Sequence, residues 1–326
     1  MSQKWEVLVD HMEVPKPGID LLKANNCTVT ILENYNADVS RPKILGALKQ
    51  GYDAVFLASK VKVDKKFLDT AGRKLKVVST MSSGYDHIDT TLIKKRGIKA
   101  GHTPEVLSAA VAEMAVLLLL SAARRAHEGR QKMEECERST GPQWLLGRDI
   151  RGSTVGIFGL GNIGQEIVKR LKAFEVGKFI HTGPRNKDKA EKELGVKYVT
   201  WGEFLAESDF LVISAPLNDE TRKRFNDEAF GEMKKQPVFV NVARGEIVDT
   251  AALERALCTS KIFAAGLDVT DPEPLPPKHK LLTLRNVVIV PHLGSATTRT
   301  RNDMATVAAQ NIINGLNNRD LVYAIP

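Results

Sequence analysis

Short apolar runs alternate with helical hydrophobic patterns along almost the whole chain, and this alternation constrains the fold more than any other feature. In the first block, we expect strands at 6–9, 28–32, 54–58, 76–80 and 98–100. A second block supplies expected strands at 155–158, 178–182, 210–214, 238–241, 264–268 and 287–290. Strands that are separated by helices pair in parallel, so the sequence predicts an α/β protein with two doubly wound parallel sheets.

The boundary between the two blocks is predicted at Thr103-Pro104, because Thr103 can cap a helix and a proline suits its first turn. We expect this apolar helix to run to about Gly129, with a surface loop over 131–149. The helix contains Glu113, whereas a membrane span requires about 20 residues without such charges, so we interpret it as buried.

A last helix is expected after the second block. Ser295 or Thr297 can cap it, and it would reach about Leu316 and return to the first domain. The 326 residues agree with two domains at roughly 150 residues each.

Composition excludes several classes of protein. With 43% hydrophobic and 26% charged residues, the chain is neither disordered nor collagen-like. Its three cysteines, Cys27, Cys136 and Cys258, form no CxxC pair, which argues against a zinc ribbon and a thioredoxin-type motif. We expect free buried thiols, no metal site and a reducing compartment, the cytoplasm. Residues 1–10 lack the pattern of a signal peptide.

The net charge of +8 is scattered along the chain rather than clustered. It favours small anionic ligands over nucleic acid as partners, and we expect neither nucleic-acid nor membrane binding.

A glycine-rich motif follows the first strand of the second block. It reads Gly159-Leu160-Gly161-Asn162-Ile163-Gly164 and lies between the strand at 154–158 and a helical pattern at 165–171. In this context the glycines permit a tight turn and the approach of a pyrophosphate, which the amides at the helix N-terminus would bind. A glycine-rich turn without a ligand is the alternative.

The end of the next strand indicates which dinucleotide binds. An NAD site usually carries an acidic residue about 20 residues after the glycines, which binds the ribose 2′-hydroxyl. Here the turn 183–187 contains Arg185 and Lys187, and the first carboxylate is Asp188. Two cations suit a 2′-phosphate, so the sequence favours NADP, with NADPH preferred. An enzyme that binds NAD through other contacts is the alternative.

Three more chemical groups are predicted at the same sheet edge, because ligands of doubly wound folds bind beyond the carboxyl ends of the strands. Strand 238–241 leads to Arg244, strand 264–268 leads to Glu273, and strand 287–290 leads to His292. The other six histidines lack this combination of position and partners. The three groups together are what the reduction of a 2-oxo acid requires.

Their chemistry assigns their roles. Arg244 would bind the substrate carboxylate through two hydrogen bonds and polarise the adjacent carbonyl. After hydride transfer to the carbonyl carbon, His292 would donate a proton to the oxygen as general acid. Glu273 would bind the other imidazole nitrogen, orient the ring and favour its protonated form.

This set of motifs resembles the D-2-hydroxyacid dehydrogenase family over nearly the whole chain. The resemblance rests on the glycine motif, Asn241-Val242-Ala243-Arg244-Gly245, Gly266-Leu267-Asp268-Val269, Pro272-Glu273-Pro274 and Pro291-His292-Leu293-Gly294-Ser295. It implies a flavodoxin-like substrate domain at 1–103 and 298–326, and an inserted Rossmann coenzyme domain at 104–297. The family's catalytic Arg, Glu and His fall on Arg244, Glu273 and His292.

Within the family, the chain resembles most the eukaryotic glyoxylate and hydroxypyruvate reductases. The pointers are Ser79-Thr80-Met81-Ser82-Ser83-Gly84, the basic residues after Gly183, Pro272-Glu273-Pro274-Leu275-Pro276, and Gly294-Ser295-Ala296-Thr297 before Arg299 and Arg301. This likeness implies reduction of hydroxypyruvate to D-glycerate and of glyoxylate to glycolate, by a homodimer. Those reductases have a tryptophan-rich loop where residues 134–147 contain only Trp144.

The resemblance also implies binding roles for residues outside the catalytic group. Backbone amides of Ser83 and Gly84 would bind the substrate carboxylate, and Ser295 would line the substrate pocket. Pro216, Val242 and Asp268 would line the nicotinamide side.

Other interpretations stay open. A phosphoglycerate dehydrogenase-like enzyme would need a regulatory domain, for which we expect no room after the last helix. A corepressor-like scaffold that senses nucleotides would use the same fold without turnover. An NADH-dependent dehydrogenase of another D-2-hydroxy acid is the third alternative.

Overall fold

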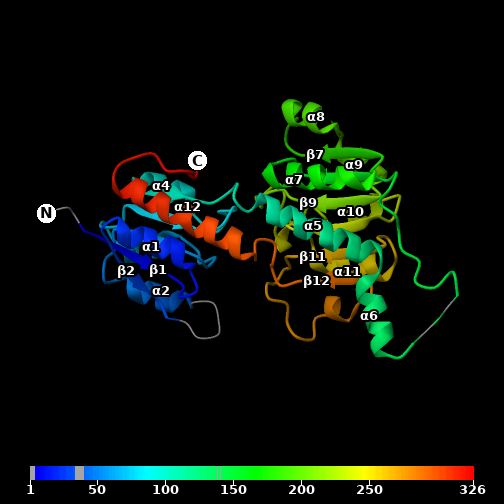
Figure 1. Ribbon diagram of the computed structural model, residues 1–326, viewed down its shortest axis with the longest axis horizontal. Coiled ribbons are helices and arrows are strands. Elements are labelled where there is room, and N and C mark those ends of the chain that lie inside the picture. Colours follow the sequence, from blue (N-terminus) through cyan, green and yellow to red (C-terminus); the bar gives the residue numbers. More distant parts are fainter. Residues whose placement is uncertain (1–3, 34–39, 138, 140) are drawn as a thin grey trace. The chain divides into compact units, whose positions relative to one another are not determined.

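The computed structural model describes residues 4–33, 40–137, 139 and 141–326. Its contacts divide the chain into two compact units. Unit 1 comprises Met1–Leu107 and Ala296–Pro326, and unit 2 comprises Ser108–Ser295. Each unit contains one parallel sheet with helices packed against it (Figure 1). The assignment of substrate and coenzyme binding to the two units stays a prediction.

The sheet of unit 1 has the strand order β2-β1-β3-β4-β5, with every neighbouring pair parallel. This is the flavodoxin-like order that the sequence predicted. The strands are β1 (Trp5–Val9), β2 (Cys27–Ile31), β3 (Ala54–Leu57), β4 (Val77–Thr80) and β5 (Lys99–Gly101). Each lies within about two residues of its predicted position, because buried parallel strands give continuous apolar runs.

The described part of unit 1 contains the helices α1 (Lys16–Ala24), α2 (Arg41–Leu48), α3 (Lys65–Ala71), α4 (Thr90–Lys95) and α12 (Thr298–Leu316). The last of these packs against α1 and β4 and buries a stripe of small and apolar side chains that includes Ala305, Ala308 and Ile312. Its N-cap is Thr297, whose hydroxyl accepts a hydrogen bond from the Thr300 amide. The N-cap is therefore Thr297 and not Ser295, the other residue that the sequence offered.

The sheet of unit 2 has the order β12-β11-β10-β9-β6-β7-β8, and all its strands are parallel. The order reverses between β6 and β9, as in a Rossmann fold. The strands are β6 (Thr154–Phe158), β7 (Lys178–Thr182), β8 (Val196–Tyr198), β9 (Phe210–Ile213), β10 (Val238–Asn241), β11 (Ala264–Leu267) and β12 (Val287–Ile289). The expectation of six strands missed β8, because three residues around the exposed Lys197 give no apolar run.

Helices of unit 2 pack against this sheet. They are α5 (Ser108–Ala123), α6 (Ala126–Glu134), α7 (Asn162–Leu171), α8 (Asp188–Leu194), α9 (Trp201–Glu207), α10 (Asp227–Glu232) and α11 (Thr250–Cys258), with short 3₁₀ turns η1 (Lys172–Phe174), η2 (Gly245–Ile247) and η3 (Lys280–Thr283). Much of the core is aromatic, with Phe158, Phe225 and Phe239 in edge-to-face contact. Such pairs add to the gain from burying apolar surface.

The apolar helix of unit 2 differs from its prediction at both ends. It begins at Ser108 rather than at Pro104: the Thr103 amide donates to the carbonyl of Ser82, and residues 105–107 form a bend and a turn before the helix. It ends at Ala123, and Arg125 takes left-handed backbone angles (φ 52°) before α6. The predicted loop is therefore helical as far as Glu134.

The cause of this break lies in the segment that returns from α6. The carbonyl of Ala123 accepts the backbone N–H of Arg148 at 2.9 Å, where a continuous helix would offer it the N–H four residues on. Gly147 lies against the same carbonyl, so closely that a β-carbon there would collide with it. Over the described ranges, no helix is both long and apolar enough to cross a membrane.

The expectation of buried thiols is wrong for two of the three cysteines. All three are free thiols, and Cys27 is buried, which raises its pKa to about 11. Cys136 and Cys258 are exposed, because each lies at or just beyond the end of its helix, α6 or α11.

Replacement of Thr297 by alanine tests the assignment of the cap. Loss of its hydroxyl leaves the Thr300 amide without its acceptor, and we expect the free energy of unfolding to fall by about 1 kcal/mol. Urea denaturation followed by circular dichroism measures the change. Thr298→Ala, at the neighbouring exposed position, is the control and should change little. Equal stability of both variants and the native protein would contradict the assignment.

Candidate active site

The glycine motif forms the turn between β6 and α7, beside the point where the strand order reverses. Gly159 has φ +94°, and a β-carbon there would lie 2.7 Å from the Ala215 Cα, so both conformation and space require glycine. Its carbonyl accepts the Ser214 hydroxyl at 2.8 Å, and its amide donates to the Thr182 carbonyl at 3.1 Å. These bonds fix the turn to the neighbouring strands β9 and β7.

The same turn has room for a phosphate group. Gly161 is exposed and is the N-cap of α7, and apart from its two neighbours in the chain no described residue comes within 4 Å of the position that a β-carbon would take there. The exposed Asn162 and the half-buried Ile163 begin the helix. Backbone amides of a first helical turn have no partner within the helix, so they are suited to bind a pyrophosphate.

The predicted selectivity turn follows β7. Arg185 is exposed and Lys187 is half-buried, and over the described ranges neither side chain forms an ion pair. Asp188, the first carboxylate after the turn, is exposed at the start of α8.

The loop after β10 positions Arg244. Asn241 is 1% exposed, and its side-chain amide donates to the Arg244 carbonyl at 2.9 Å while its oxygen accepts the Ala243 amide at 3.0 Å. The guanidinium of Arg244 contacts the Ala243 carbonyl at 2.9 Å. Gly245 packs directly on the backbone at Thr270, where a β-carbon would collide with the carbonyl. The backbone of the loop that carries Arg244 is therefore in contact with the backbone of the loop that carries Glu273.

The structure brings Glu273 and His292 together. Nδ1 of His292 lies 2.7 Å from Oε1 of Glu273, although the two residues are 19 positions apart in the chain. Both side chains are about one-third exposed, 31% for the imidazole and 35% for the carboxylate. A carboxylate at Nδ1 fixes the orientation of the ring.

Asp268 fixes the loop that carries His292. Its carbonyl accepts the His292 amide at 2.8 Å, and its carboxylate accepts the amides of Leu293 and Gly294 at 2.6 and 2.9 Å. Burial raises the pKa of this carboxyl above its ordinary value, although the two amides and His292 act in the opposite direction. His292 itself has φ 55°, a left-handed conformation that these bonds stabilise.

The sequence did not predict that Asn241 and Gly245 hold the loop of Arg244 in place. For Asp268 it predicted only a position beside the nicotinamide, not the bonds to the loop of His292. A polar residue that ends a buried strand is the signal that could have found Asn241 and Asp268. For Gly245, the contact across the loops cannot be deduced from local sequence, since its partner Thr270 belongs to the next strand's loop.

Other predicted binding residues fall in both units. In unit 2, Pro216 and Val242 follow β9 and β10, at the same sheet edge as Asp268, and the buried Ser295 is the last residue of the unit. In unit 1, Ser83 and Gly84 follow β4; their carbonyls accept hydrogen bonds from His102 and Ser82, at 2.8 Å each. Their roles in binding stay predictions.

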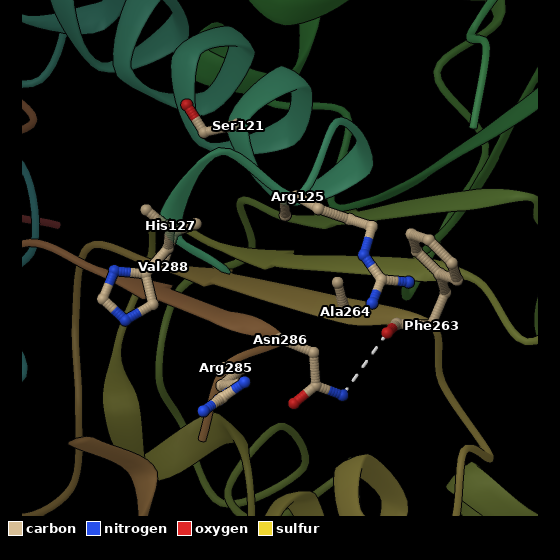
Figure 2. Close-up of a pocket in the computed structure, with 9 residues that line it drawn as sticks. Ser121, Arg125, His127, Phe263, Ala264, Arg285, Asn286 and Val288 are labelled. Carbon is tan, nitrogen blue, oxygen red and sulfur yellow. Dashed lines mark hydrogen bonds between the residues drawn. The ribbon is translucent and has the colours of Figure 1, made fainter. Parts of the chain in front are cut away.

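A hollow at the opposite end of the strands is distinct from this site. It is lined by residues of α5, α6 and the amino-terminal ends of β11 and β12, including His127, Phe263 and Asn286 (Figure 2). Two of its cations are in ion pairs, Arg125 with Glu128 at 2.7 Å and Arg285 with Glu135 at 2.9 Å. Among the described side chains, no group of three His, Cys, Asp or Glu could hold a metal ion.

Comparison with known proteins identifies the family of this chain. The family model of the D-isomer specific 2-hydroxyacid dehydrogenase NAD-binding domain matches residues 116–294. Human glyoxylate reductase/hydroxypyruvate reductase is 44% identical over 306 residues, which cover 93% of this chain and 92% of the human protein.

Solved structures are similar over the whole length of the chain. A protein from Thermus thermophilus has a TM-score of 0.89 at 35% identity, with coverage of 98% of this chain and 100% of the other. The NADPH-dependent glyoxylate/hydroxypyruvate reductase of Sinorhizobium meliloti, solved with NADP and malonate, has a TM-score of 0.84 at 27% identity, with coverage of 99% and 97%. The chain belongs to the D-2-hydroxyacid dehydrogenase family, as its motifs predicted.

Proposed function

We propose that the protein is an NADPH-dependent reductase that converts hydroxypyruvate to D-glycerate and glyoxylate to glycolate. The observation that carries the proposal is the 2.7 Å contact between Glu273 and His292, at the sheet edge where the glycine turn and the Arg244 loop also lie. The substrates are proposed from the human relative, which bears the names of both activities.

The residues present fit a dinucleotide. The open space above Gly161 leaves room for a pyrophosphate. Arg185 and Lys187, which form no ion pair with any described residue, suit a 2′-phosphate. We assign the pyrophosphate to the turn of Gly159, Gly161, Asn162, Ile163 and Gly164, the 2′-phosphate to Arg185 and Lys187, and the nicotinamide to Pro216, Val242 and Asp268. When bound, NADPH supplies the hydride that the carbonyl carbon accepts.

His292 supplies the proton. With Nδ1 facing Glu273, the proton leaves from Nε2 and reaches the carbonyl oxygen, which becomes the hydroxyl of the product. The ring then takes a proton back from solvent. Glu273 keeps the ring in one orientation.

Arg244 orients the substrate. A guanidinium can form two parallel hydrogen bonds with a carboxylate, which sets the plane of the 2-oxo acid. The internal bonds of Asn241 hold the backbone from which this side chain extends. Backbone amides of Ser83 and Gly84, and the hydroxyl of Ser295, are proposed as further substrate ligands. A cytoplasmic location is proposed as well.

Replacement of His292 by glutamine tests the general acid. Because the variant cannot donate an imidazolium proton, we expect kcat to fall by about 10²–10⁴-fold while the Kd for NADPH changes little. Stopped-flow and steady-state assays with hydroxypyruvate measure the effect. His127→Gln, in the hollow of Figure 2 at the other end of the strands, is the matched control. Native turnover in the His292 variant would assign the proton to another group.

Replacement of Arg185 by alanine tests the choice of coenzyme. Loss of a charge-assisted contact with the 2′-phosphate should raise the KM for NADPH roughly tenfold and leave that for NADH unchanged. Lys189→Ala removes an exposed cation of α8 and serves as the control. An equal loss for both coenzymes would show that Arg185 acts on another part of the dinucleotide.

We propose that the molecule is a homodimer formed through unit 2. Large apolar side chains are exposed along α5, α6 and the segment that follows: Leu117 (54%), Met133 (75%), Trp144 (41%) and Leu146 (54%). Burial of such surface against a second copy would stabilise the pair.

Sedimentation of the full chain tests the dimer. We expect a dimer for the native protein and a monomer for the double variant Leu117→Glu and Met133→Glu, because each places a charge in the contact. Leu282→Glu, at an exposed leucine of η3, is the control and should stay dimeric. A monomeric native protein would overturn the proposal.

A further inference from the structure

A buried histidine lies beneath the turn that carries Arg185 and Lys187. His181 is the fourth residue of β7 and is only 1% exposed. Its Nε2 lies 2.9 Å from Oε1 of Glu191, whose side chain reaches back from α8 and is 17% exposed. Burial of an imidazole and a carboxylate is costly unless each has a hydrogen-bond partner, and here each is a partner of the other.

The same carboxylate oxygen also binds the end of the turn. Oε1 of Glu191 accepts the backbone N–H of Lys187, the residue that precedes α8. Burial raises the pKa of Glu191, but the hydrogen bonds from Lys187 and His181 outweigh it, and the pKa lies below its ordinary value. Glu191 is therefore a carboxylate at neutral pH. Through Oε1, this residue of α8 is bound both to His181 of β7 and to the Lys187 amide at the end of the turn.

The start of the turn is fixed as well. The Tyr198 hydroxyl donates to the Gly183 carbonyl at 3.0 Å, and Tyr198 pairs with His181 across the β7–β8 ladder. The two rings are also in edge contact, with centroids 5.2 Å apart. Between these two ends lie the exposed residues 184–186, which include Arg185.

This arrangement controls the charge that the turn presents. A carboxylate near the end of β7 suits the ribose hydroxyls of NAD and repels a 2′-phosphate. Glu191 lies close to that position in space, yet its oxygen is directed to His181 and to the Lys187 amide. The charged side chains that the turn itself presents are therefore the cations Arg185 and Lys187.

We propose that His181 and Glu191 are positioning residues that set the preference for the 2′-phosphorylated coenzyme. His181 holds the carboxylate of Glu191 away from the ribose site, and Glu191 holds the turn so that Arg185 and Lys187 face the 2′-phosphate. The inference rests on the proposed function, because it concerns the same dinucleotide site.

His181→Phe is the first test. Phenylalanine fills a similar volume beside Tyr198 but cannot bind Glu191. We expect the Kd for NADPH and for adenosine 2′,5′-bisphosphate to rise roughly three- to tenfold, the scale of one hydrogen bond. The Kd for NADH and kcat at saturating NADPH should stay unchanged. His181→Gln retains a terminal N–H donor and should restore tight binding, which a merely structural role would not require.

Glu191→Ala is the second test, because it is independent of whether the buried His181 variant folds. It should weaken NADPH and adenosine 2′,5′-bisphosphate and leave NADH unchanged. If the two residues act as one unit, the double variant should lose no more than the larger single loss. Glu193→Gln, at an exposed carboxylate of the same helix, is the matched control and should bind like the native protein.

Several results would overturn the inference. These are an equal loss for NADPH and NADH, unchanged binding of both in folded variants, or weaker NADH binding in Glu191→Ala, which would assign this carboxylate to the ribose hydroxyls. Adenosine 2′,5′-bisphosphate binds without turnover. Failure of the proposed reductase activity would therefore appear separately, as absent turnover with intact nucleotide binding.

Discussion

Parallel pairing of the seven strands in unit 2 brings all their carboxyl ends to one edge, and the chemistry of the molecule depends on that constraint. Gly159, Arg244, Glu273 and His292 are distant in sequence, but each follows a strand of the same sheet. No single loop could supply a phosphate-binding turn, a guanidinium and an imidazole–carboxylate pair. The sheet supplies them by placing short loops side by side at one edge.

Buried polar side chains convert this general arrangement into a defined geometry. Asn241 ends β10 and Asp268 directly follows the adjacent β11. Both are almost fully buried, and they bind backbone groups of the loops that carry Arg244 and His292. At the turn after β7, the half-buried Glu191 binds the Lys187 amide and the buried His181. In each case a side chain satisfies backbone groups of a loop at the carboxyl edge of the sheet, which favours one conformation of that loop. The functional side chains at the surface depend on these anchors.

Local sequence predicted the strands well, because buried parallel strands are continuous apolar runs bounded by glycine, proline and polar residues. It also predicted which side chains follow each strand, and hence the meeting of Glu273 with His292. It failed where a distant segment decides local structure. The helix breaks at Arg125 because the backbone N–H of Arg148 donates to the carbonyl of Ala123. The short strand β8 exists because it pairs with β7. The Glu191 contact was missed for the same reason, since nothing in the α8 sequence shows that its carboxylate reaches a strand residue.

A steady-state assay of the full chain tests the central claim most directly. Four reactions are sufficient: NADPH or NADH, each with hydroxypyruvate or glyoxylate. We expect oxidation of NADPH by both substrates, with kcat/KM at least about tenfold higher than with NADH, the difference that one charge-assisted contact provides. Nucleotide binding without turnover of any pair would contradict the assignment of a reductase, and a preference for NADH would contradict the role given to the turn after β7.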